Sequence, residues 1–153
     1  MTQLVLHHYP VSPFAEKIRL ILGYKQLPWT SVIIPNIMPK PDVVALTGGH
    51  RRTPFLQIGS DIYCDTALVA DVLEQLAPTP SLYPSAQKGV VRIVAQWADS
   101  QLFPVAMAYN FQPAGVAQVF AGAPAEGVQA FVADRTAMRS GAARMASSAT
   151  EAM

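Results

Sequence analysis

Apolar positions near the N-terminus change from a strand-like run to a helical spacing within a few residues. Leu4–Leu6 is a continuous apolar run that predicts a short, buried strand. Ser12 and Pro13 favour the first positions of a helix, and apolar residues then recur every three or four positions. Trp29–Ile34 is rich in β-formers and predicts a second strand. Because a helix joins the two strands, we expect them to be parallel.

The middle of the first half carries a proline-rich stretch followed by a hairpin signal. Three prolines between Pro35 and Pro41 exclude regular structure there, and residues 42–46 could form only a short helix. Phe55–Ile58 and Asp61–Cys64 are two apolar runs separated by Gly59–Ser60. A glycine that opens a two-residue turn predicts an antiparallel pair of strands.

A third helix follows the hairpin. Asp65 and Thr66 both favour a helix N-terminus, and the apolar residues between Leu68 and Leu76 then share one helical face. The resulting order, β-α-β-α-β-β-α with a mixed four-stranded sheet, is that of an α/β thioredoxin-like domain.

The pattern changes after the third helix. Residues 78–84 hold three prolines and predict a stiff linker between a domain over 1–77 and a region over 85–153. We expect this second region to be all-α, with a long helix from about Ser85 that Pro104 kinks or ends. A final helix is predicted from near Pro124, followed by a weakly patterned tail over 141–153. Two long helices are therefore expected.

Composition narrows the functional class. The chain is 51% hydrophobic, which is enough for a substantial core, and its 11 basic and 10 acidic residues form no basic patch for nucleic acid. Neither a signal peptide nor a membrane-spanning run is evident. With a single cysteine, Cys64, these features favour the cytoplasm. His7, His8 and His50 lack the spacing of a metal site, so we expect no metal.

Three motifs stand in a characteristic order. They are Ser12-Pro13-Phe14-Ala15 at the first helix, Thr53–Pro54 before the third strand, and Asp65–Thr66 at the third helix. The chain thereby resembles the cytosolic glutathione transferase family, in its serine or cysteine form, well from Leu4 to about Leu76 and loosely beyond. The resemblance implies glutathione binding, conjugation to a small electrophile as in detoxification, and a homodimer. It also implies that the helical region is shortened, because family members usually continue through several more helices.

The resemblance assigns the catalytic role to Ser12, whose hydroxyl would stabilise the glutathione thiolate. A hydroxyl at a helix N-terminus lies near unpaired N–H groups and the positive end of the helix dipole, so an anionic sulfur beside it would be stabilised. A helix cap alone would also explain Ser12. Redox exchange is excluded at this position, since Ser12 and Ala15 stand where a disulfide exchanger needs cysteines.

Further glutathione contacts follow from the resemblance. A cis bond at Pro54 would turn Thr53 toward the cysteinyl backbone, and Asp65 with Thr66 would hold the γ-glutamyl end. Arg52 best matches the cation for the glycine carboxylate. The remaining candidates are Phe14 as a glutathione contact, Lys40, His50 and Arg51 as reserve cations, and Tyr9 near the sulfur.

Two alternatives remain open. A transferase-like protein without turnover could serve as a binding or scaffold module, which the short helical region favours. A glutathione-dependent isomerase of the maleylacetoacetate type would use the same Ser-Pro helix opening, but it would need cations for a dicarboxylate. The helical region offers Arg92, Arg135, Arg139 and Arg144. The sequence does not identify the electrophile.

Overall fold

The computed structural model describes residues 3–84 and 87–137. By their internal packing, the residues fall into two units, Met1–Pro84 and Ser85–Met153. The first unit contains the sheet and the second is helical.

Four short strands build the sheet of the first unit. They are β1 (Leu4–His8), β2 (Thr30–Ile33), β3 (Phe55–Ile58) and β4 (Asp61–Cys64). Their order in the sheet is β2-β1-β3-β4. The β1 and β2 strands are parallel, whereas β3 runs antiparallel to both β1 and β4. The predicted mixed four-stranded thioredoxin-like fold is confirmed.

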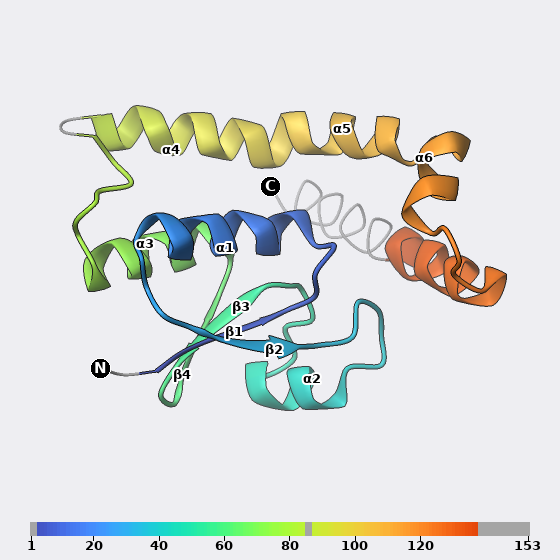
Figure 1. Cartoon of the computed structure of the whole chain (residues 1–153), viewed down its shortest axis with the longest axis horizontal. Coiled ribbons are helices and arrows are strands. Elements are labelled where there is room, and N and C mark those ends of the chain that lie inside the picture. The colour runs from blue at the N-terminus through green and yellow to red at the C-terminus, as the bar shows by residue number, and fades with distance from the viewer. Residues whose placement is uncertain (1–2, 85–86, 138–153) are drawn as a thin grey trace, which may run out of the picture. The chain divides into compact units, whose positions relative to one another are not determined.

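Three helices cover the sheet, with α1 and α3 on one face and α2 on the other (Figure 1). They are α1 (Pro13–Tyr24), α2 (Pro41–Thr47) and α3 (Thr66–Leu76). The short α2 ends at Gly48, which adopts a left-handed backbone with φ of 66°. Glycine takes this conformation without steric cost, so it commonly ends a helix.

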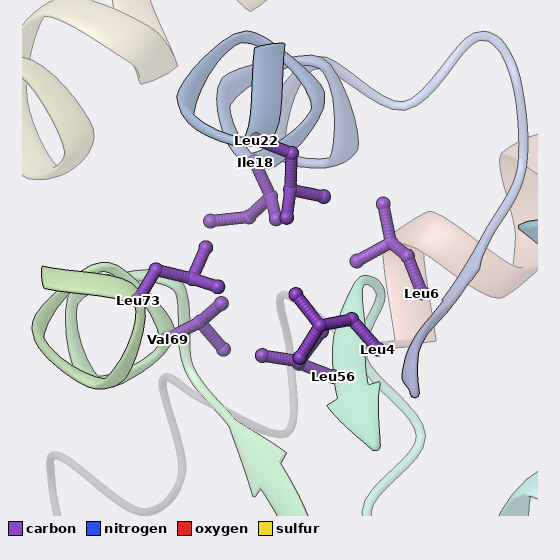
Figure 2. Packing of buried hydrophobic residues seen from close by; sticks show 7 residues of the cluster. All are labelled: Leu4, Leu6, Ile18, Leu22, Leu56, Val69 and Leu73. Atoms are coloured by element: carbon purple, nitrogen blue, oxygen red, sulfur yellow. The ribbon is translucent and has the colours of Figure 1, made fainter. Parts of the chain in front are cut away.

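Two apolar clusters hold these layers together. The larger one joins three strand leucines to residues of α1 and α3, whose side chains point toward one another in Figure 2. Its buried members are Leu4, Leu6, Ile18, Leu22, Leu56, Val69 and Leu73. On the opposite face, Val43 of α2 packs with Ile34 and Phe55. Each fully buried leucine contributes about 2 kcal/mol relative to an exposed one, so this core is a large contribution to the stability of the first unit.

Hydrogen bonds fasten residues 78–84 to the end of α3. Glu74 accepts from Lys25 Nζ at 2.6 Å, from Ser81 Oγ at 2.6 Å and from the Leu82 N–H at 3.0 Å. Tyr83 adds a bond from its hydroxyl to Asp71 Oδ1 at 2.7 Å. The proline-rich segment predicted as a linker is therefore attached to the first unit.

Burial by itself raises the pKa of Glu74, but the hydrogen bonds from Lys25, Ser81 and the Leu82 N–H outweigh it and lower this pKa to about 2. The carboxylate is therefore held in its charged form by Lys25 at the end of α1 together with Ser81 and Leu82 of the segment that it binds.

The second unit begins with a nearly continuous helical run. It consists of α4 (Lys88–Trp97), a π-helical segment η2 (Ala98–Leu102) and α5 (Phe103–Asn110). Pro104 lies in the first turn of α5, so it does not end the run as one alternative predicted. The π-helical hydrogen bond from the Phe103 N–H to the Ala98 carbonyl lies directly before this proline, which cannot donate.

The expectation of two long helices missed a short one between them. This helix, α6 (Pro113–Val119), begins with a proline at its first turn, a position that the prediction overlooked as a helix start. A further helix covers residues 125–137 of the described chain, close to the predicted start at Pro124. The predicted weakly patterned tail over 141–153 lies outside the described residues.

Candidate active site at one edge of the sheet

The strand register brings the three sequence motifs to one edge of the sheet. His7 of β1 is paired with Phe55 of β3, which is in turn paired with Cys64 of β4. The chain leaves β1 for Ser12 just beyond this row, enters β3 from Thr53–Pro54, and leaves β4 for Asp65–Thr66. Neighbouring strands lie about 4.8 Å apart, so the three segments emerge about 10 Å from one another or less.

Ser12 is the N-cap of α1. Its Oγ accepts a hydrogen bond from the Ala15 N–H at 3.2 Å, and its own N–H donates to the Tyr9 carbonyl at 3.2 Å. The residue is only 3% exposed. The cap uses an oxygen lone pair, which leaves the hydroxyl proton available to donate. A structural role for Ser12 as a cap is thus established, and it is compatible with a role toward a ligand.

A polar network underlies the loop that carries Ser12. Arg19 donates to His8 Nδ1, to the Pro10 carbonyl and to Glu16 Oε2, at 2.9, 2.9 and 2.7 Å. His8 Nε2 bonds to Ser31 Oγ at 2.8 Å. Burial, followed by the charge of Arg19, lowers the pKa of His8, so its Nδ1 can remain an acceptor at neutral pH.

Thr53 and Lys40 meet at the entrance to β3. The Thr53–Pro54 bond is cis, as predicted. Lys40 Nζ donates to Thr53 Oγ1 at 3.4 Å and to the Arg51 carbonyl at 3.3 Å, and lies 5.8 Å from the centre of the Tyr9 ring. Lys40 is 3% exposed, unusual burial for a lysine. The chain therefore places one cation beside Thr53 and near the loop before Ser12.

The other predicted basic residues occupy the loop before β3. Arg52 is exposed, whereas His50 and Arg51 are half-buried. Burial and the positive charge of Arg52 lower the pKa of His50, while the carboxylate of Asp65 opposes this shift. Arg52, His50 and Asp65 therefore interact electrostatically.

Asp65 has a strained backbone at the start of α3. Its φ of 81° lies in a region that side chains other than glycine rarely adopt, which costs about 1–3 kcal/mol. Its Oδ1 accepts from the N–H groups of Ala67 at 2.8 Å and Leu68 at 3.3 Å. The side chain is exposed, so it caps the helix and also faces solvent.

Thr66 lies next to Asp65 and is buried. Its Oγ1 accepts a hydrogen bond from Lys17 Nζ at 3.2 Å. A residue of α1 therefore holds the hydroxyl at the start of α3 and adds a positive charge there. The predicted Phe14 lies half-buried in the first turn of α1.

The pocket beside α2 and the two histidines of β1 are separate from the three motifs. The pocket between α2 and the sheet, lined by His7, Val43 and Phe55 among others, includes Lys40 but not Ser12, Thr53 or Asp65. His7 stacks on Phe55 while His8 meets Trp29 and Ser31, so the adjacent histidines point to opposite faces.

Cys64 is partly buried against the Phe55 cluster, and burial raises the pKa of its thiol. A small apolar packing role fits it better than a reactive one. Among residues 3–84 and 87–137, no group of three or more candidate side chains could hold a metal ion. Within the same residues, no helix has both the length and the apolar character needed to cross a bilayer.

Sequence reasoning missed the supporting residues Lys17, Arg19 and His8. The spacing offered one usable signal: Arg19 lies about two helical turns beyond Ser12, which places both on one side of α1. The partner of Lys17 could not be found in this way because Thr66 is distant in sequence.

Comparison with known proteins agrees with this architecture. Residues 6–81 match the family described as glutathione S-transferase, N-terminal domain. The crystal structure of a GST-like protein from Pseudomonas syringae matches this chain with a TM-score of 0.71 and 55% sequence identity. The match covers 84% of this chain and 44% of the Pseudomonas chain. Rice GST1, solved in complex with glutathione, matches with a TM-score of 0.55 and 26% sequence identity, over 64% of this chain and 46% of the rice chain.

One curated protein is also similar to this chain in sequence. The pyrimidodiazepine synthase of Drosophila melanogaster is 29% identical over 85 residues, or 53% of this chain and 35% of the synthase. The chain thus spans less than half the length of each of these three relatives. Its thioredoxin-like domain, family match and helical continuation agree, and the chain belongs to the glutathione S-transferase family.

Proposed function

We propose that the edge of the sheet formed by the ends of β1 and β4 and the start of β3 binds glutathione and stabilises its thiolate for attack on a small electrophile. The observation that carries this proposal is the register row His7, Phe55 and Cys64, from which Ser12, Thr53 and Asp65 emerge together. The rice relative was solved with glutathione, which supports the same ligand here.

Ser12 supplies the group nearest the sulfur in this proposal. Its Oγ accepts from the Ala15 N–H, so the hydroxyl can donate its proton toward a thiolate at the positive end of α1. A hydrogen bond to the charged form favours that form and lowers the thiol pKa. The thiolate is the nucleophilic form of the sulfur.

Glutathione carries charges at both ends, and the edge offers a partner for each. The exposed carboxylate of Asp65 suits the γ-glutamyl ammonium, and the start of α3, with the Thr66 hydroxyl and Lys17, suits its carboxylate. For the glycine carboxylate we propose Lys40, because it contacts Thr53, whereas Arg52 is exposed beside His50.

The first experiment is a calorimetric titration of the purified chain with glutathione, combined with the ultraviolet absorbance of the bound thiolate against pH. We expect saturable binding and a thiol pKa below that of free glutathione. Ser12→Ala should raise that pKa by about one unit while changing affinity less. Absence of binding by a folded sample would refute the proposal.

Two matched variants separate the hydroxyl from the cap. Ser12→Thr keeps both the cap and the hydroxyl and should preserve the lowered thiol pKa. Ser12→Asp keeps the cap but places a carboxylate beside the sulfur, so it should lose the thiolate. If Ser12→Asp retained it, Ser12 would be only a cap.

The γ-glutamyl contact is tested by Asp65→Ala. We expect about a tenfold loss of affinity, with the thiol pKa almost unchanged, because one charged hydrogen bond is removed far from the sulfur. Asp65→Asn is the matched control, since asparagine caps a helix as well as aspartate does but carries no charge. Affinity unaffected by either change would exclude this contact.

The assignment of Lys40 is tested with an esterified ligand. Lys40→Met should weaken glutathione binding, yet it should leave the affinity for the glycyl ethyl ester of glutathione, which has no charge on the glycine carboxyl group, close to that of the unaltered chain. Arg52→Met provides the comparison. If Arg52→Met alone showed this dependence on the glycine charge, Arg52 would be the cation, as the family resemblance implies.

A further inference from the structure

The side chain of Arg19 holds the loop that precedes Ser12. Arg19 donates to the end of β1 through His8 Nδ1 at 2.9 Å and to the loop itself through the Pro10 carbonyl at 2.9 Å. It also donates to Glu16 Oε2 in the first turn of α1 at 2.7 Å. The strand, loop and helix around Ser12 therefore share a single guanidinium.

The groups bonded to Arg19 are themselves held in place. His8 is 4% exposed, bonds through Nε2 to Ser31 Oγ at 2.8 Å and meets the edge of Trp29. Ser31 lies in β2 and Trp29 directly precedes it, so the hydrogen bonds of Arg19 are connected through His8 to a second strand of the sheet. Ser12 is connected to the same loop, since its N–H donates to the Tyr9 carbonyl at 3.2 Å.

A guanidinium suits this position because Arg19 uses a different nitrogen for each of its three acceptors, in fixed directions. The three donors of a lysine ammonium share one nitrogen on a flexible stem. A lysine at this position would retain the charge, but we expect its single nitrogen not to reach the strand end, the loop and the helix together.

We propose that Arg19 is a positioning residue, which holds the loop from Tyr9 to Ser12 so that the Ser12 hydroxyl stays directed at the glutathione sulfur. The effect of Arg19 on the thiolate rests on the proposed function. Its role in holding the loop from Tyr9 to Ser12 does not depend on that function. Arg19 acts through Ser12 and does not itself contact the ligand. Small misplacement of a catalytic group is enough to reduce its effect substantially.

The test compares Arg19→Lys with the unaltered chain. We expect the pKa of bound glutathione to rise by about one unit, which is about tenfold less thiolate at a fixed pH below both values. The dissociation constant should change by less than about threefold, because the ligand contacts at Thr53 and Asp65 remain. An unchanged thiol pKa in Arg19→Lys would overturn the proposal.

A control for general destabilisation is available on the same helix. Leu22 is fully buried at the other end of α1, so Leu22→Ala should lower the free energy of unfolding more than Arg19→Lys does. It should nevertheless leave the thiol pKa unchanged. An equal pKa shift in both variants would assign the effect of Arg19 to stability alone and overturn the proposal.

Amide hydrogen exchange tests the geometric part independently of glutathione. The Ser12 and Ala15 N–H groups, which bond to Tyr9 and Ser12, should exchange about tenfold faster in Arg19→Lys, whereas amides of β3 should not change. If the unaltered chain bound no glutathione, the proposed function would fail, and these rates would still decide the role of Arg19. Unchanged Ser12 and Ala15 exchange would refute it.

Discussion

The two units of the chain use similar apolar patterns but bury them very differently. In the first unit, Leu56, Ile18 and Leu73 are fully buried where α1 and α3 meet the sheet. In the second, no residue of α4, η2, α5 or α6 is buried, and Ile93 is 71% exposed. An amphipathic spacing is therefore enough to form a helix, whereas a core requires a second surface in the right place.

The fluorescence of the two tryptophans can follow the unfolding of the two units separately, because Trp29 belongs to the first unit and Trp97 to α4 of the second. Trp29 packs partly buried against the main core, while Trp97 is 53% exposed. Replacing one of them by phenylalanine leaves a fluorescence signal from one unit only. The following predictions use these two reporter backgrounds.

The largest expected effect comes from Leu56→Ala. Removing a fully buried leucine should lower the free energy of unfolding by about 4 kcal/mol, measured by denaturant titration of Trp29 fluorescence in a Trp97→Phe background. The matched change in the other unit, Ile93→Ala, should cost about 0.5 kcal/mol or less in the Trp29→Phe background. Equal costs would contradict the contrast between the units.

The next effect is a dependence of the first unit on acid. The pKa of Glu74 is about 2 in the folded chain against an ordinary 4.5, so it contributes about 3 kcal/mol of stability above pH 4.5. This contribution is lost as the pH falls from about 4.5 toward 2, because the unfolded chain then binds the proton first.

Unfolding titrations followed through Trp29 should show this loss, and Glu74→Gln should remove most of the acid dependence. The exposed carboxyl groups common to both chains cancel in the comparison. Parallel pH profiles for the two chains would show that Glu74 does not stabilise the fold in this way.

The third effect, smaller than the two in the first unit, is expected in the second unit, at Gly115 of α6. A Cβ at this position would overlap the Asn110 carbonyl oxygen, so Gly115→Ala must displace the turn between α5 and α6. We expect a local cost of about 2 kcal/mol, visible as faster amide exchange over residues 110–117. Exchange in the first unit should not change. Gly127→Ala is the control, because its added Cβ would meet nothing within 4 Å.

Local patterns were sufficient to predict most of the fold. The Ser12–Pro13 opening, the Gly59–Ser60 turn and the Asp65 cap are short-range signals, and each occurs at the predicted element boundary. The helix α6 was missed because Pro113 was not considered as a first-turn residue. The attachment of residues 78–84 was also missed, since proline content predicts an extended backbone but not the hydrogen bonds to Glu74.

The candidate site was predictable as a set of motifs but not as a set of contacts. The family resemblance implied Arg52 as the cation for the glycine carboxylate, and this stays a prediction. The contact of Lys40 Nζ with Thr53 Oγ1 could not be predicted, because the two residues are 13 positions apart in the sequence. The same limit applies to Lys17 and Thr66, which are joined only through the packing of α1 on α3. The positive φ of Asp65 also has no signature in the sequence.

The spacing of Ser12 and Arg19 along α1 has a consequence for insertions and deletions. Each residue added to a helix turns everything beyond it by about 100° and advances it by about 1.5 Å. One added residue between Ser12 and Arg19 would rotate the guanidinium away from His8 and Pro10 even though no side chain had been replaced. The first two turns of α1 should therefore tolerate no change of length.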